Sequence, residues 1–163
     1  MNKPKYLYHG SANQNIVVFE PRQESIRDVK EGAVVFATDS QISASKFIVP
    51  CDESWSQLSR FGDTQVAIYS DRNKFKELDK GGAIYTLSST SFIIDPQFTK
   101  SSQEYTSRIP VKPIAKEIFN SGLKAMLKHG VKVYFVTPEQ LITIKNAADH
   151  GLKIIKTLQP ERY

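Results

Sequence analysis

The chain has few of the residues and segments on which several protein classes depend. Its 163 residues include one cysteine, Cys51, which excludes an intrachain disulfide and a cysteine-rich zinc site. No apolar run reaches the roughly 18 to 20 residues that cross a bilayer, and no apolar stretch follows the lysines near Met1. We therefore expect a cytoplasmic protein with no membrane partner.

The common catalytic motifs are also missing. The sequence has no Gly-rich phosphate-binding loop, no Gly-x-Gly-x-x-Gly, no nucleophile elbow and no His-Glu-x-x-His. Its three histidines are His9, His129 and His150, which are too scattered to indicate a metal site, and we expect no metal. His129 and His150 each precede a glycine at an expected helix end, where a structural role is typical.

Apolar residues are sufficient for one core. Hydrophobic residues make up 40% of the chain and aromatic residues 10%, far above the range of disordered chains. The length suits a single domain. Lysines and arginines outnumber aspartates and glutamates by 22 to 17, and they are spread along the chain. This excess is compatible with a phosphate-bearing partner and equally with solvated surface lysines.

The first half of the chain has the pattern of strands separated by turns. Apolar and β-branched runs predict strands at 6–8, 16–19, 33–37, 64–70 and 82–87. Asp39 and Ser40 are candidate N-caps for a short helix. The residues expected to face inward from this helix are Ile42, Ala44 or Ser45, and Phe47. Residues 71–80 are expected to form a polar connection.

The second half is more helical. Helical spacing of apolar residues predicts a helix over 114–129 that ends at Gly130. Alternation predicts a strand over 131–136, and Thr137-Pro138-Glu139 has the pattern of an N-cap, an N1 proline and an acidic first turn. Residues 152–158 are compatible with helix or strand. Many strands, few helices and no regular β-α alternation indicate an α+β domain.

Two motifs near the beginning of the chain have a familiar pattern. Tyr8-His9-Gly10-Ser11 ends the first expected strand, where a glycine lets backbone approach a ligand closely. Gly32 precedes the strand over 33–37, which is followed by Thr38 and then Ser43-Ala44. These residues resemble the first two motifs of the ADP-ribosyltransferase-like superfamily, which includes poly-ADP-ribose polymerases, DNA-targeting ADP-ribosyltransferases and RNA 2′-phosphotransferases. Gln103-Glu104 fits the slot of the third motif, a glutamate on a later strand.

The resemblance implies a fold, a substrate and a reaction. The fold is a single α+β domain over 1–163, with a mainly antiparallel split sheet and peripheral helices. Its motifs lie within 6–107, and 114–163 would form a helix–strand–helix extension. The implied reaction is that of a glycosyltransferase that uses NAD as substrate and transfers ADP-ribose to a nucleic-acid or protein acceptor. Glu104 would bond the ribose 2′-hydroxyl and stabilise the positive charge that grows as nicotinamide leaves.

The resemblance assigns further residues to NAD. His9 would bond a ribose hydroxyl, and the Gly10 backbone would pair with the nicotinamide amide. The other binding candidates are Ser11, Phe36, Ala37, Thr38, Ser43 and Phe47. Arg22 is the candidate pyrophosphate clamp, because a guanidinium can grip two oxygens. Arg27 and Lys30 are further candidates for that role.

One departure from the polymerase pattern keeps other functions open. Val35 stands where the polymerases have a tyrosine that stacks on nicotinamide, so Phe47 or Tyr85 is expected to supply the aromatic surface. The missing tyrosine favours a catalytically inactive module that binds NAD, ADP-ribose or a nucleotide. The net charge of +5 is also compatible with a basic nucleic-acid-binding domain in which the motif matches are accidental.

Overall fold

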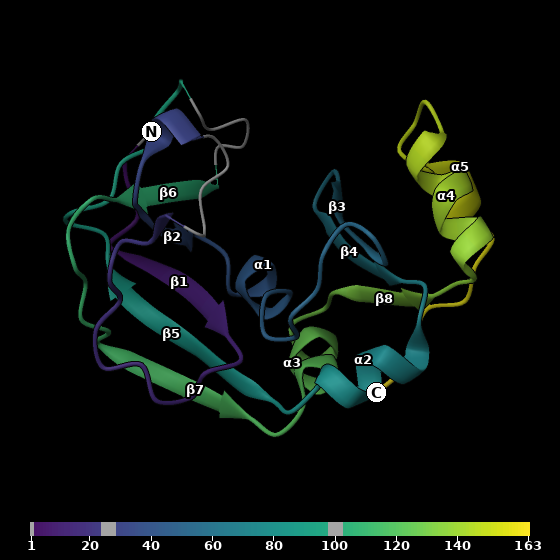
Figure 1. Ribbon diagram of the computed structural model, residues 1–163, viewed down its shortest axis with the longest axis horizontal. Helices are drawn as coiled ribbons and strands as arrows, with labels where there is room; N and C mark the ends of the chain where they lie inside the picture. Colours follow the sequence, from purple (N-terminus) through teal and green to yellow (C-terminus); the bar gives the residue numbers. More distant parts are fainter. Residues whose placement is uncertain (1, 24–28, 98–102) are drawn as a thin grey trace.

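Two β-sheets lie on either side of the short helices α1 and α3 (Figure 1). The structure is a computed structural model that describes residues 2–23, 29–97 and 103–163. The first sheet is antiparallel, in the order β6-β2-β1-β5-β7, and the second has the order β3-β4-β8. The chain is thus a single α+β domain, as the sequence indicates. Within the described residues, no helix has the length and apolar character needed to span a membrane.

The strands and helices are short. The first sheet contains β1 (Tyr6–Ser11), β2 (Val35–Thr38), β5 (Gly82–Ser88), β6 (Glu104–Ser107) and β7 (Ala115–Phe119). The second contains β3 (Ser56–Phe61), β4 (Thr64–Tyr69) and β8 (Lys132–Phe135). The helices are the 3₁₀ turn η2 (Val29–Glu31), α1 (Gln41–Ser45), α2 (Arg72–Leu78), α3 (Gly122–Lys128), α4 (Pro138–Asn146) and α5 (Leu152–Ile155).

The first sheet is split between β1 and β2. Strand β1 pairs with β5 along six residues, but with β2 only through Tyr8 and Thr38. Beyond that pair, the Phe36 carbonyl oxygen is hydrogen-bonded to the side chain of His9 and not to the backbone of β1. The His9 Nδ1 lies 2.7 Å from this oxygen. The opening between the two strands therefore has a side chain, rather than backbone pairing, across it.

Small residues let helix α1 pack tightly against β1. Ser40 is its N-cap, and the Ser40 hydroxyl accepts a hydrogen bond from the Ser43 backbone N–H at 3.2 Å. The buried residues of α1 are Ser43, Ala44 and Ser45. The expectation that Ile42 and Phe47 face inward is wrong: they are 36% and 57% exposed. Larger side chains on the buried face would hold the helix away from the strand.

The expected helix over 114–129 is two elements. Its first part is β7, which pairs with β5 and forms an edge of the first sheet. Its second part is α3, which begins after the N-cap Ser121. The Asp79 carboxylate fixes this start by accepting from the Gly122 and Leu123 backbone N–H groups. A few apolar residues at helical spacing could not reveal that β5 leaves an edge for this segment to join.

Of the other expected elements, some are wrong and some are confirmed. Residues 16–19 form no regular strand, although Phe19 makes a β-bridge with Val111. The expected connection over 71–80 contains α2, whose N-cap Asp71 accepts from the Lys74 N–H at 2.9 Å. The segment after 130 is integrated into the second sheet, because β8 pairs in parallel with β4. The N-cap predicted at Thr137 is confirmed, with Gln140 completing a capping box, and the ambiguous segment at 152–158 contains α5.

Gly10 tests the contact between β1 and α1. A Cβ atom at this position would lie 1.9 Å from the Ala44 carbonyl oxygen, so Gly10→Ala must push the helix away. We expect the free energy of unfolding to fall by about 3 kcal/mol, measured by urea denaturation. Gly62→Ala is the control, since Gly62 has a φ of 59° but no atom near its Cβ position, and should cost about 1 kcal/mol. Equal losses would contradict the tight contact.

Candidate functional site

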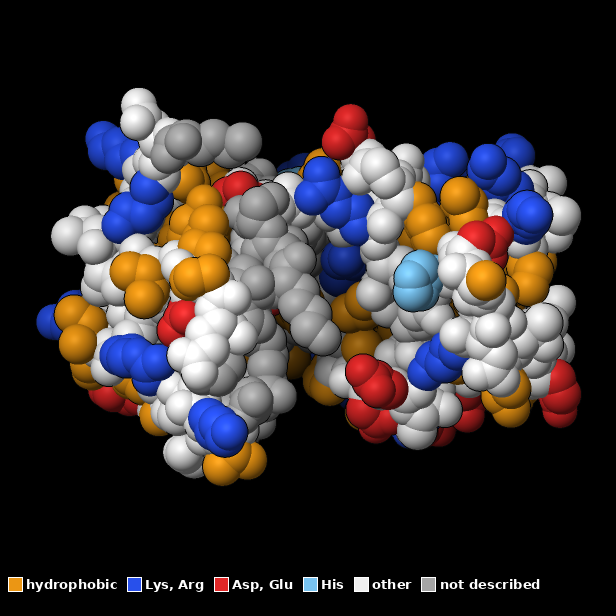
Figure 2. Space-filling model, turned by 90° about the horizontal axis from the view of Figure 1, so that it is seen from above, with side chains coloured by type: hydrophobic (Ala, Val, Ile, Leu, Met, Phe, Trp, Pro, Cys, Tyr) orange, Lys and Arg blue, Asp and Glu red, His pale blue; other side chains and the backbone are white. Residues whose placement is uncertain are grey.

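A cavity of about 650 Å³ lies between the two sheets, above α1. The space-filling view shows the hollow between the two halves, with Lys or Arg side chains along the second-sheet side (Figure 2). Strands β1, β2 and β6 supply one wall, and strands β3 and β4 supply the other. Helix α1 and the residues that follow it contribute Ser43, Ala44, Lys46 and Phe47 to the same cavity.

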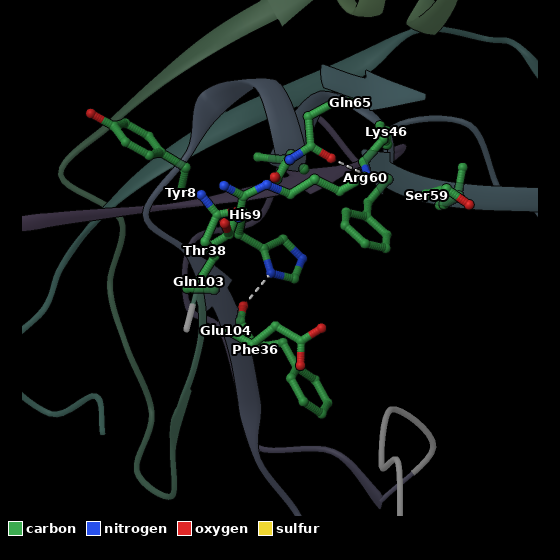
Figure 3. Close-up of a pocket in the computed structure, with 16 residues that line it drawn as sticks. Tyr8, His9, Phe36, Thr38, Lys46, Ser59, Arg60, Gln65, Gln103 and Glu104 are labelled. Carbon is green, nitrogen blue, oxygen red and sulfur yellow. Dashed lines mark hydrogen bonds between the residues drawn. The ribbon is translucent and has the colours of Figure 1, made fainter. Parts of the chain in front are cut away.

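The cavity brings together most of the residues that the sequence singled out. The candidates that line it are His9, Gly10, Phe36, Ala37, Thr38, Ser43, Phe47 and Glu104 (Figure 3). Ser11 does not line it, and its hydroxyl accepts from the Asn13 N–H instead. Arg22 is exposed and does not line it either, while its backbone bonds to Val34. Lys30 is exposed on η2, and Arg27 lies outside the described residues.

His9 presents a defined hydrogen-bonding atom to the cavity. A carbonyl oxygen only accepts, so Nδ1 must carry the proton that it donates to Phe36. Burial lowers the pKa of His9 despite this hydrogen bond, and the positive charge of Arg22 lowers it further. The neutral ring therefore keeps a lone pair on Nε2, which can accept from a ligand hydroxyl. The ring points into the cavity (Figure 3) and packs at 4.6 Å from Phe19.

The register of β2 and β6 places Glu104 on the cavity wall. Thr38 and Glu104 are directly paired across the two strands, so their side chains share one face of the sheet. Phe36 lies two residues before Thr38 and points to the same face. The carboxylate of Glu104 extends into the space that the His9 ring also enters (Figure 3). An acceptor nitrogen and a carboxylate can thus contact one ligand.

The aromatic surface of the cavity comes from Phe36 and Phe47. Val35 lies in the core at 4% exposure, so its side chain contributes nothing to the cavity. Tyr85, the other expected surface, is fully buried in the same core. Its hydroxyl donates to the Asn13 carbonyl at 2.6 Å and accepts from the Ile16 N–H at 3.0 Å. The expectation for Tyr85 is therefore wrong, because its ring is held inside the first sheet's core.

The sequence predicted the strand that carries Gln65, but it assigned no residue of the second wall to the site. Lys46, Arg60 and Gln65 line it, together with Leu58 and Ser59 of β3. Lys46 is only 7% exposed, and its Nζ donates to Gln65 Oε1 at 2.6 Å. Burial, aided by the positive charge of Arg60, lowers the pKa of Lys46 to about 8. Strand β3 has no apolar run, and a lone lysine in a polar stretch normally indicates solvent, so the sequence carried no signal for this wall.

Cys51 does not line the cavity. Burial raises the pKa of the Cys51 thiol, which disfavours the reactive thiolate. In the part of the chain that the structure describes, no three His, Cys, Asp or Glu side chains group as metal ligands would.

Comparison with protein-family models, with curated proteins and with solved structures finds no match for this chain. The cavity's geometry must therefore carry any functional proposal.

The tautomer of His9 is directly testable. Nitrogen-detected NMR should show Nδ1 protonated and Nε2 unprotonated at neutral pH, with a pKa below the ordinary 6.5. Because the unfolded state takes up a proton first as the pH falls, His9 contributes its full stability above about 6.5 and loses it as the pH falls through the folded pKa. His9→Gln should remove this part of the pH dependence of unfolding. A proton on Nε2, or a pKa above 6.5, would contradict the geometry.

Proposed function

We propose that this chain is an NAD-dependent enzyme with an ADP-ribosyltransferase-like fold, which transfers ADP-ribose to a macromolecular acceptor. One observation carries the proposal: residues from three separate sequence motifs, on β1, on β2 with α1, and on β6, line a single cavity. Chance matches to three short motifs have no reason to converge in space. The split between β1 and β2 also agrees with the sheet that the resemblance implies.

The proposed roles follow from the chemistry of each group. The Nε2 lone pair of His9 accepts a hydrogen bond from a ribose hydroxyl, which the Nδ1 bond to Phe36 makes possible. Glu104 bonds the 2′-hydroxyl of the nicotinamide ribose. Gly10 lies where the β1–β2 pairing has already ended, which favours the approach of the nicotinamide amide to its backbone. Phe47 offers a ring against which nicotinamide can pack.

The reaction breaks the bond between C1′ of the ribose and the nicotinamide nitrogen. Nicotinamide leaves as a neutral molecule with the bonding electron pair, and positive charge develops on the ribose ring. A carboxylate fixed beside that charge stabilises it, and such preorganised groups contribute about 100-fold or more to the rate. The acceptor's nucleophilic atom then forms the new bond to C1′ and releases its proton to solvent.

The replacement of the polymerase tyrosine does not favour an inactive module in this fold. Because Val35 points into the core, its identity does not change the surface of the cavity. Phe36 and Phe47 line the cavity instead. Both groups that the chemistry needs, the His9 ring and the Glu104 carboxylate, reach the same space.

Glu104→Gln tests the chemistry. It keeps the shape of the side chain but removes the negative charge, so nicotinamide release from NAD should fall at least about 100-fold, measured by chromatography of the product. Glu77→Gln is the matched control, since Glu77 is exposed on α2. Equal rates for the parent and Glu104→Gln would rule out the assigned role. Thermal stabilisation by NAD with no release, even with nucleic-acid and protein acceptors present, would replace the enzyme with a binding module.

Phe47→Ala tests the aromatic surface. The KM for NAD should rise by about fivefold to tenfold, because a packed ring is removed from the ligand. The melting temperature should hardly change, since Phe47 is 57% exposed. Ile42→Ala is the control: Ile42 lies in α1, shortly before Phe47, and does not line the cavity. An unchanged KM for Phe47→Ala would remove this residue from the site.

A further inference from the structure

The second-sheet wall of the cavity holds a buried ammonium that no carboxylate of the described residues accompanies. We call Lys46, Arg60 and Gln65 the basic wall. Lys46 is more than nine-tenths buried, and its hydrogen-bond partner is the neutral amide of Gln65. Among the described residues, no aspartate or glutamate forms an ion pair with Lys46. A buried ammonium is costly unless an anion accompanies it.

Arg60 adds to this charge. It extends from the neighbouring strand β3 into the same cavity, and its positive charge disfavours the ammonium of Lys46. Its Nε donates to the Gly62 carbonyl at 2.7 Å, and its Nη2 lies 3.5 Å from a carboxylate oxygen of the exposed Asp63. These contacts hold the guanidinium beside the hairpin turn. Lys46, which directly follows α1, and Arg60 of β3 thus bring two cations to one cavity.

The opposite wall has the opposite character. The titratable side chains that line the cavity are Tyr8, His9, Lys46, Arg60 and Glu104. Glu104 and the neutral His9 belong to the first sheet, whereas Arg60 comes from β3 of the second sheet and Lys46 is hydrogen-bonded to Gln65 of β4. A ligand that fits this cavity should place developing positive charge at Glu104 and negative charge at the basic wall.

We propose that the basic wall binds the diphosphate group of the nucleotide ligand. This inference rests on the proposed function, because it assigns a further part of the same dinucleotide. A diphosphate carries at least two negative charges, so it can accompany the buried ammonium of Lys46 and also contact Arg60, and the Gln65 amide has N–H groups to donate to its oxygens. The assignment replaces Arg22, which is exposed and does not line the cavity.

Binding of ADP and of adenosine separates the diphosphate from the rest of the nucleotide. Calorimetry on the full chain should show that ADP binds more tightly than adenosine. Lys46→Met should lower the affinity for ADP by at least tenfold and change the affinity for adenosine less than twofold. Methionine preserves the length and apolar stem of lysine but removes the charge. Lys124→Met is the matched control, since Lys124 is exposed on α3, and it should change neither affinity. Arg22→Met should leave ADP binding within twofold.

Each other outcome overturns the inference. Parent protein that binds ADP no better than adenosine has no diphosphate subsite. A Lys46→Met variant that weakens both ligands equally has lost the cavity as a whole. If Arg22→Met lowers the affinity for ADP and Lys46→Met does not, the diphosphate is assigned to Arg22. If circular dichroism shows that Lys46→Met does not fold, Arg60→Met takes its place. A loss of at least threefold in the affinity for ADP, with the affinity for adenosine unchanged, supports the basic wall, and an unchanged affinity for ADP overturns it.

Nicotinamide release, measured in parallel, keeps the two proposals separate. Parent protein that binds ADP through Lys46 but never cleaves NAD, with or without acceptors, sustains the diphosphate subsite and overturns the proposed enzyme. Parent protein that cleaves NAD with a KM that Lys46→Met leaves unchanged sustains the enzyme and overturns the subsite.

Discussion

The close contact between β1 and α1 is the constraint on which the cavity depends. Gly10 lets the Ala44 carbonyl approach the strand to a distance that any side chain would prevent. Ala44 itself is fully buried. With its small residues turned inward, the helix directs Lys46 and Phe47 to the cavity. The same contact therefore positions groups for both ends of a ligand.

The two walls differ because they come from different sheets. The first sheet supplies a lone-pair nitrogen and a carboxylate, whereas the second supplies an ammonium and a guanidinium. Opposite charges at contact would neutralise each other, but here they stand on separate walls. The ligand that we propose, a zwitterionic dinucleotide, has the same polarity, which a simple anion or cation does not have.

How much of this the sequence predicted depends on whether the signal was local. Strand β2 and the start of α1 follow from a β-branched run and a serine cap, and the motif residues His9, Thr38 and Glu104 do line one cavity. The sequence could not predict the basic wall, since Lys46, Arg60 and Gln65 come from three separate segments that meet only in the folded chain. Strand β7 was missed for a similar reason, because its partner β5 is remote in the chain.

The single residue pair between β1 and β2 affects how firmly Glu104 is held. Strands β2 and β6 form a two-stranded ribbon, and its backbone connection to β1 is the pair Tyr8–Thr38. The ribbon is held in place by the apolar contacts of its inner face, among them Val35 and Tyr105, together with a backbone bridge between Thr106 and Ile93. Glu104 is carried on this ribbon, so the orientation of its carboxylate is set by the density of the core behind it. A volume change in that core would therefore shift the Glu104 carboxylate without any substitution among the residues that line the cavity.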